Sequence, residues 1–382
     1  MDSGRHDLDR VLEGLWQCLA NDKRPLGLVL GAGCPVSIPA PSDGAPAPLI
    51  PDIAGLTAAI NTLLSTSNLK DDHSILLAEL VADLGREPNV EEILSRLRTL
   101  ALVAGAQKVR NLSKSSIEAL ERAVTAAIAD LVNAQLPEAD TPYDTIATWV
   151  KSAVRSAPVR VFTTNYDLLV EMAFERNGTP YFDGFVGARE PFLDIEAIEL
   201  DDLPPRWARL WKLHGSSNWT LLPSGRVVRR NPVGDEDRPL IHPSHLKYDE
   251  SRRMPYLVML DQLRGFFKEP SATLVTLGYS FGDDHINELL IHGLQSNPSA
   301  TVFGLQFGTL DSYPGASALA AKHPGLTLLA ADGGVIAGAN ACWQLQPDGS
   351  ARSCELGDFS KFGDYLRRLV GRTAQRPRST GV

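Results

Sequence analysis

Four short motifs bring small polar residues to positions where apolar runs of the sequence end. They are GAGC (31–34), TTNYD (163–167), LHGS (213–216) and GYSFGD (278–283). Glycines in such a turn let backbone N–H groups approach a diphosphate closely. The amide of Asn165 can orient a water or a hydroxyl group, and the imidazole of His214 can accept a proton near pH 7. Together the motifs predict a ligand site with diphosphate-binding turns and a proton acceptor.

Each motif also has a purely structural interpretation. Residues 31–33 can form an ordinary tight turn, because Val36 breaks the full G-x-G-x-x-G pattern. Asn165 and Asp283 can each cap the helix that follows. A single histidine such as His214 can be a hydrogen-bonded structural residue. The motifs are therefore informative as a set rather than one by one.

The elements that must position these motifs alternate between strands and helices. Short apolar runs predict buried strands at 26–30, 159–163, 210–213, 274–277, 301–305 and 326–330. Helical spacing of apolar residues predicts helices at 8–20, 166–177, 284–295 and 359–370. This alternation indicates an α/β fold with a Rossmann-like, mostly parallel sheet and helices on both faces. Ligands of such sheets bind at the carboxyl ends of the strands, so we expect all four motifs at one edge.

The order of the elements also predicts a domain organisation. Residues 56–156 show several amphipathic segments and are expected to form an α-helical insertion between two strands. The Rossmann-like domain then comprises residues 1–55 and 157–330, and residues 331–382 form a C-terminal extension with a closing helix. Turn signals and charges at 219–258 predict a hairpin and a charged surface excursion. The helices of the insertion can mediate contacts in an oligomer or simply cover the sheet.

The composition excludes several classes of protein. With 382 residues, 43% of them hydrophobic, the chain is not mainly disordered. A net charge of −9 argues against nucleic-acid binding by this chain alone. The polar N-terminus and the lack of a long apolar run predict a cytoplasmic protein without a signal peptide or membrane span. Four scattered cysteines exclude a zinc ribbon, and His242 and His245 alone are too few ligands to predict a metal site.

The motifs, in this order, resemble the sirtuin-like domain of bacterial anti-phage defence proteins. The stretches PNVEEILSRL (88–97) and IHPSHLKY (241–248) add to this resemblance, which covers residues 20–310. Chains of this length in the family resemble those encoded beside a HerA-type ATPase. Because sirtuins bind NAD in a Rossmann-type sheet, the resemblance implies NAD as the ligand.

The resemblance also implies roles for individual residues. Asn165 and His214 match the catalytic asparagine and histidine of the family, and Asp167 is expected to order the loop that carries Asn165. Residues 31–33 are expected at the pyrophosphate, and residues 278–280 at the adenine ribose and phosphates. The full set expected to bind NAD is Gly31, Ala32, Gly33, Cys34, Thr163, Asp167, Gly278, Tyr279, Ser280 and Asp283. Cys34 is expected to pack beside the glycine turn and not to act as a nucleophile.

These implications favour an NAD glycohydrolase that releases nicotinamide and ADP-ribose. Sirtuin deacylases carry a four-cysteine zinc module after the histidine, whereas no cysteine lies between His214 and Pro270, so protein deacylation is disfavoured. Uncontrolled destruction of NAD is toxic, so activity is expected to depend on assembly, as a homo-oligomer or with the ATPase, or on a trigger. Two alternatives remain open: a sensor of NAD or ADP-ribose, and a nuclease subunit of a complex with a DNA-translocating ATPase.

Overall fold

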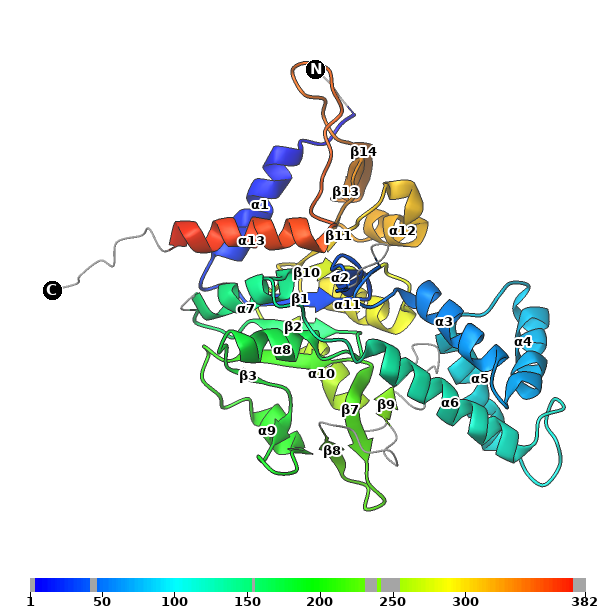
Figure 1. The fold of residues 1–382 in the computed structure, drawn as a ribbon. Coiled ribbons are helices and arrows are strands. Elements are labelled where there is room, and N and C mark those ends of the chain that lie inside the picture. The colour runs from blue at the N-terminus through cyan, green and yellow to red at the C-terminus, as the bar shows by residue number, and fades with distance from the viewer. Residues whose placement is uncertain (1–3, 42–46, 153–154, 231–238, 242–254, 374–382) are drawn as a thin grey trace.

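The fold is built on a nine-stranded, mostly parallel sheet. The computed structural model describes residues 4–41, 47–152, 155–230, 239–241 and 255–373 (Figure 1). The strands of the sheet lie in the order β14 (Ala339–Cys342), β13 (Gly333–Ile336), β12 (Leu326–Leu329), β11 (Thr301–Leu305), β10 (Thr273–Leu277), β1 (Leu26–Leu30), β2 (Arg160–Thr163), β6 (Ala208–Lys212) and β3 (Tyr181–Phe182). Only the pairs β12–β13 and β13–β14 are antiparallel. The predicted α/β class with a mostly parallel sheet is confirmed.

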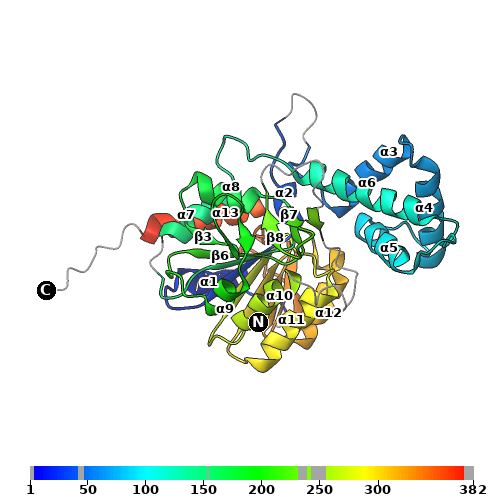
Figure 2. The same ribbon diagram turned by 90° about the horizontal axis from the view of Figure 1, so that it is seen from below.

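Helices cover both faces of this sheet, because its strands are apolar on both sides. In β1, Leu28 and Leu30 belong to one buried cluster, and Val29 between them belongs to the other. The first cluster includes side chains of α1 (Leu8–Ala20), α7 (Pro142–Ser152), α8 (Leu169–Arg176) and α13 (Phe359–Thr373). The second includes side chains of α10 (Tyr256–Phe266), α11 (Asp284–Ser296) and α12 (Pro314–Lys322). Figure 2 shows these layers on either side of the strands.

Four helices stand apart from the sheet and form a projection at one side of the molecule (Figures 1 and 2). They are α3 (Ile53–Ser65), α4 (Lys70–Leu84), α5 (Val90–Val103) and α6 (Lys114–Val132). Their buried leucine, isoleucine and valine side chains pack against one another. These helices therefore lie to one side of the sheet and not over either of its faces.

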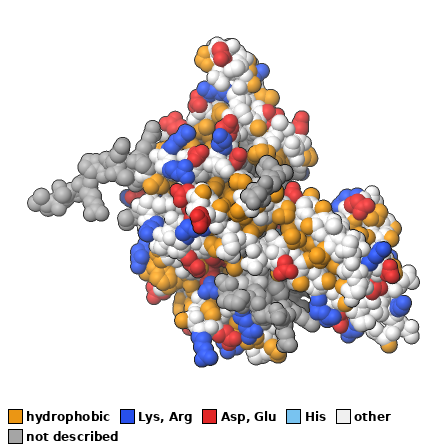
Figure 3. Space-filling model, in the orientation of Figure 1, with side chains coloured by type: hydrophobic (Ala, Val, Ile, Leu, Met, Phe, Trp, Pro, Cys, Tyr) orange, Lys and Arg blue, Asp and Glu red, His pale blue; other side chains and the backbone are white. Residues whose placement is uncertain are grey.

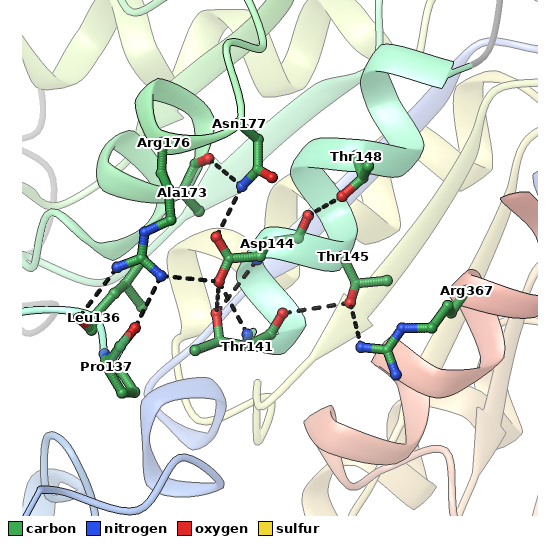
Figure 4. A network of polar contacts seen from close by, with 10 residues as sticks. All are labelled: Leu136, Pro137, Thr141, Asp144, Thr145, Thr148, Ala173, Arg176, Asn177 and Arg367. Carbon is green, nitrogen blue, oxygen red and sulfur yellow. Dashed lines mark hydrogen bonds and ion pairs between the residues drawn. The ribbon is translucent and has the colours of Figure 1, made fainter. Parts of the chain in front are cut away.

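The helix α7 does not belong to this projection, although the expected insertion extended to residue 156. Asp144 of α7 is buried and accepts from the amide of Asn177 at 2.8 Å, and it pairs with Arg176 at 3.4 Å (Figure 4). The ring of Tyr143 lies edge-on to Phe359 of α13, with the centroids 4.9 Å apart. The helical pattern of the sequence continues through 156, but these contacts place α7 in the layer over the sheet.

The last part of the chain also joins the main sheet. The strands β13 and β14 form an antiparallel hairpin at its edge, and α13 then crosses one face of the sheet. The expected extension 331–382 is therefore continuous with the sheet up to the end of α13. Its closing helix lies where the apolar spacing of 359–370 predicts it.

A second, small antiparallel sheet is formed by strands on both sides of the histidine motif in the sequence. It contains β4 (Phe185–Val186), β5 (Phe192–Leu193), β8 (Val227–Arg229), β7 (Gly215–Leu221) and β9 (Pro239–Ile241), in this order. The β7–β8 hairpin lies within the predicted hairpin region. The sequence pattern does not predict the sheet as a whole, because β4 and β5 have only two residues each. Most of the charged excursion, with His242 and His245, lies outside the described residues.

Candidate active site

The four motifs follow strands that are neighbours in the sheet and end in register. Leu30 at the end of β1 pairs with Leu277 of β10 on one side and with Thr163 of β2 on the other. Thr163 in turn pairs with Lys212 of β6. The turns after these strands therefore begin side by side at the carboxyl edge, as the sequence predicts. The point between β1 and β10, where the strand order changes direction, is the usual ligand position in such sheets.

The two glycine turns at this point pack backbone against backbone. Gly33 N–H donates to the carbonyl of Gly278 at 2.9 Å, and Gly31 N–H donates to the carbonyl of Leu277 at 2.9 Å. A Cβ atom at Gly31 would lie 2.4 Å from the Gly278 oxygen, and Gly278 itself has a φ of +60°. Only glycine allows this approach and this backbone conformation. The glycines are thus needed for the packing of the two turns, and their role at a pyrophosphate stays a prediction.

The side chain of Asn165 is held against the first glycine turn. Its Nδ2 donates to the carbonyl of Gly31 at 3.1 Å. Its backbone N–H donates to Oγ1 of Thr163 at 3.0 Å, and the Thr163 hydroxyl donates to the carbonyl of Leu30 at 2.8 Å. The Asn165 side chain is half-buried. The amide therefore has a fixed direction at the sheet edge and keeps part of its surface accessible.

His214 is buried and hydrogen-bonds to Asp283, the first carboxylate of the fourth motif. Its Nε2 lies 2.9 Å from Oδ2 of Asp283, and the other oxygen of Asp283 caps helix α11 by accepting from His285 N–H at 3.0 Å. Burial lowers the pKa of His214, but the hydrogen bond and charge of Asp283, together with the charge of Glu91, outweigh it and raise the pKa overall. Asp283 thus acts as a helix cap and also fixes the imidazole.

A buried charged cluster lies directly behind the Asn165 loop. The ammonium group of Lys212 contacts the backbone carbonyls of Tyr166 and Asp167, and it lies 3.1 Å from Oε1 of Glu171. Burial raises the pKa of Asp167 to about 6, against the opposing charge of Lys212 and with a smaller contribution from Glu171. Asp167 accepts from Leu169 N–H at 3.0 Å, which orders the turn after Asn165. The prediction that Asp167 orders this loop is consistent with these contacts.

The helical projection also reaches the site, through the first turn of α5. The hydroxyl of Tyr166 donates to Oε1 of Glu91 at 3.4 Å, and the charge of Glu91 contributes to the pKa of His214. Asn89 and Glu92 form a capping box that sets the start of this helix. The sequence of 88–97 indicates a helix start and adds to the family resemblance, but it gives no reason to expect Glu91 at the site, so the position of Glu91 is a finding of the structure.

Three residues expected to bind the ligand have their side chains engaged inside the protein. The thiol of Cys34 is fully buried and donates to the carbonyl of Leu277 at 3.3 Å. Burial raises the pKa of Cys34 well above its usual value. The hydroxyl of Tyr279 lies 2.9 Å from Oδ1 of Asn287, and Thr163 bonds to β1 as described above. These side chains shape the turns, whereas Ala32, Gly33 and Ser280 are exposed beside them.

The charged side chains beside the site that the sequence did not predict are Lys212, Glu171 and Glu91. Lys212 lies within the histidine motif region, and a charged residue between the apolar Trp211 and Leu213 of a buried strand was the available signal. The partners of Lys212 come from distant parts of the chain, so the sequence could not name them. Within the described ranges, no cluster of three or more His, Cys, Asp or Glu could hold a metal ion. No described helix is long and apolar enough to cross a membrane.

Comparison with known proteins identifies part of the chain. Residues 159–313, which contain β2, β6, β10 and the turns after them, match the family model of the SIR2-like domain. This part of the chain is therefore similar to the SIR2-like domain, in line with the resemblance of the motifs. No curated protein matches the chain.

Solved structures of Sir2 are also similar to the protein. A complex of Sir2 with the inhibitor EX-527, 2'-O-acetyl-ADP-ribose and a deacetylated p53 peptide is 14% identical, covers 80% of this chain and 90% of its own, and has a TM-score of 0.36. A Sir2 mutant with a p53 peptide and NAD is 12% identical, with coverages of 97% and 100% and a TM-score of 0.34.

Proposed function

We propose that this protein is an NAD glycohydrolase, which cleaves the bond between nicotinamide and ribose. The observation that carries the proposal is the register of the strand ends. Asn165 lies two residues after Thr163, and His214 lies two residues after Lys212, while Thr163 and Lys212 are paired in adjacent strands. An oriented amide and an imidazole with a carboxylate partner thus follow equivalent positions of the same edge. The sirtuin-like domain makes NAD the expected substrate at this edge.

The small residues of the two glycine turns fit a dinucleotide. Ala32, Gly33 and Ser280 are exposed at the carboxyl edge, next to the half-buried Asn165. Small side chains at these positions allow a phosphate or ribose to approach the backbone closely. We infer that the diphosphate lies over these turns and that the nicotinamide ribose lies toward Asn165 and His214.

The chemistry of the cleaved bond determines what the two residues contribute. Departure of the cationic nicotinamide leaves positive charge on the ribose, so the reaction needs a positioned nucleophile and few protein groups. The Asn165 amide donates to the Gly31 carbonyl, and the side chain also hydrogen-bonds to the buried Asp167 and Tyr143. We infer that the accessible part of this half-buried amide orients a water or a ribose hydroxyl.

His214 then accepts a proton from that water or hydroxyl. Since Nε2 faces Asp283, Nδ1 is the nitrogen that takes the proton. The carboxylate of Asp283 stabilises the imidazolium that forms and holds the ring in one orientation. Lys212 and Asp167 lie on the side of the Asn165 loop that faces the protein interior, and they hold this loop in place.

The test is to incubate the purified protein with NAD, alone and with a candidate activating partner, and to follow nicotinamide and ADP-ribose by chromatography. We expect equal amounts of the two products, and loss of turnover in Asn165→Ala and His214→Ala. A Cys34→Ser variant serves as the matched control, because its hydroxyl can keep the bond to Leu277. Full turnover in both alanine variants would eliminate the proposed site. Nucleotide-dependent thermal stabilisation without any product would instead favour the sensor.

We further propose that the reaction depletes NAD in cytoplasmic anti-phage defence, in an oligomer or together with a HerA-type ATPase. Exposed apolar residues of the projection support an assembly role: Leu102 and Val103 are 74% and 65% exposed, and Leu63 is 54% exposed. Figure 3 shows apolar side chains among charged ones on the side where α3–α6 lie. Light scattering at concentrations where activity is measured tests the assembly, and a monomer at full activity contradicts it.

The alternative of direct nucleic-acid binding has less support. The β7–β8 hairpin region carries three arginines within five residues, a local basic patch, and each has a partner within the protein. Arg229 pairs with Asp183, Arg230 pairs with Glu190 at 3.3 Å, and Arg226 lies over the ring of Phe192. Phosphate binding at this patch would have to compete with these contacts. Any role for nucleic acid is therefore expected to be indirect.

A further inference from the structure

The ammonium group of Lys212 connects the two strands whose ends carry Asn165 and His214. Lys212 is the last residue of β6, two residues before His214, and its side chain is only 1% exposed. It contacts the carbonyls of Tyr166 and Asp167, at 3.4 Å for the former, and Oε1 of Glu171 at 3.1 Å. A lysine ammonium has three N–H donors, so these three acceptors can satisfy all of them. A buried ammonium group whose donors are all used in this way is held in one position.

The carbonyls that Lys212 contacts belong to the loop that carries Asn165. The Tyr166 carbonyl also accepts from Ser217 N–H at 2.9 Å, and Leu213 N–H donates to the Thr163 carbonyl at 2.8 Å. Three positions of the segment 212–217 thus bond to β2 and the loop after it, but only the Lys212 contact comes from a side chain. A side-chain contact can be removed by substitution without changing the backbone of either strand.

We propose that Lys212 is a positioning residue, which holds the loop of Asn165 in the orientation needed for cleavage of NAD. This inference rests on the proposed function of the site, while the contact itself does not. Lys212 touches neither substrate nor reacting atoms in this scheme. Its effect passes through the Tyr166 and Asp167 carbonyls to the Asn165 amide, whose direction is also set by Gly31.

The charges around Lys212 show why its removal has two separable effects. Asp167 and Glu171 are the carboxylates of the cluster, and the groups facing Asp167 from α7 and α2 (Gly33–Val36) are the neutral Tyr143 and Cys34. Substitution by methionine leaves the two carboxylates without their cation, which destabilises the fold most where they are ionised. It also removes the donors to the loop at every pH.

A double variant separates these effects. In Lys212→Met/Glu171→Gln, the charged pair is removed as a unit, so we expect much of the lost stability to return. Methionine still cannot donate to the loop carbonyls, so turnover should stay low. Arg209→Met is the matched control, because Arg209 is a second cation of β6 that is 1% exposed, but it pairs with Asp201 outside the site.

The experiment measures kcat and KM for NAD, the unfolding free energy, and hydrogen exchange of the amides of residues 164–170 and of Ser217. In Lys212→Met and in the double variant, we expect kcat to fall about a hundredfold and KM to change less than about threefold. This is the pattern expected when a catalytic group is misplaced. Exchange of these amides should become faster. Arg209→Met should change neither the exchange of these amides nor kcat.

Each outcome decides between the proposals. A folded double variant with wild-type kcat and unchanged exchange overturns the positioning role. If Arg209→Met lowers kcat as much as the Lys212 variants do, the positioning role is also overturned. The loss of activity would then come from general destabilisation of the fold. If the wild-type protein does not cleave NAD under any condition, the proposed function fails. Hydrogen exchange then still tests whether Lys212 orders the loop.

Discussion

Nε2 of His214 and Oδ2 of Asp283 lie 2.9 Å apart, although 69 residues separate them in the chain. Asp283 uses its second oxygen to cap α11, so one carboxylate fixes both a helix and an imidazole. Asn and Asp are equally good helix caps, whereas only the carboxylate can stabilise a protonated histidine. The substitution Asp283→Asn therefore separates the two tasks.

We predict that Asp283→Asn lowers kcat about a hundredfold while it leaves the melting temperature nearly unchanged. It should also lower the pKa of His214, which Asp283 helps to raise against the effect of burial. The acid side of the pH–rate profile should then move to lower pH. Product chromatography across a pH series and thermal denaturation measure these effects. The control is Asp52→Asn, which makes the same change at the cap of α3. Wild-type activity in Asp283→Asn would show that this carboxylate does not assist His214.

A second prediction concerns Asp167 and the pH dependence of stability. Burial is the largest cause that raises the pKa of this carboxyl from 3.8 to about 6. Between these values the folded protein holds a proton that the unfolded chain has released, so the contribution of Asp167 to stability falls as the pH rises through this window. Above pH 6 the ionised carboxylate destabilises the fold by up to about 3 kcal/mol.

The variant Asp167→Asn removes this titration and keeps an oxygen that can accept from Leu169 N–H. We expect it to be more stable than the wild type at pH 7.5, and to lose most of this advantage at pH 4. Its turnover should nevertheless fall, because the Asn165 loop loses its charged partner. Urea denaturation of both proteins at the two pH values measures the difference. A gain in stability that is the same at both values would show that Asp167 is not the titrating group.

The parts of the fold that the sequence predicted are those that depend on local pattern. Continuous apolar runs such as 26–30 and 301–305 coincide with β1 and β11, because a strand buried on both faces needs no polar positions. Helix α1 likewise begins and ends where its apolar spacing predicts. The four motifs follow from the same logic, since each is the first polar stretch after a buried strand.

The parts that the sequence did not predict depend on contacts between distant residues. Strands β4 and β5 are too short to produce a period, and only their pairing makes them recognisable. Helix α7 has the same amphipathic pattern as α6, and its assignment to the sheet layer comes from Arg176 and Phe359. The pairing of His214 with Asp283 could not be derived either, because an N-terminal helix cap explains the aspartate fully by itself.

A third prediction tests the contact between the two glycine turns. In Gly31→Ala the new Cβ would lie 2.4 Å from the carbonyl oxygen of Gly278, so the turns must move apart. We expect a loss of about 1–3 kcal/mol of stability, as for overpacking, and a loss of NAD cleavage because Asn165 bonds to the Gly31 carbonyl. Gly14→Ala is the control, since no atom lies within 4 Å of its Cβ and alanine favours the helix there. Equal melting temperatures of Gly31→Ala and the wild type would contradict the close packing.

The last prediction concerns Cys34, whose place after the glycine turn invites the interpretation of a nucleophile. The thiol is fully buried, it bonds to the carbonyl of Leu277 at 3.3 Å, and burial raises its pKa, so very little thiolate forms at neutral pH. Cys342 is exposed and free, and it provides an internal reference. We expect iodoacetamide at pH 8 to modify Cys342 in the folded protein while Cys34 stays unmodified until urea unfolds the chain. Mass spectrometry of the digested protein distinguishes the two sites. If Cys34 is modified as fast as Cys342 and NAD cleavage is lost, Cys34 is instead a reactive residue of the site.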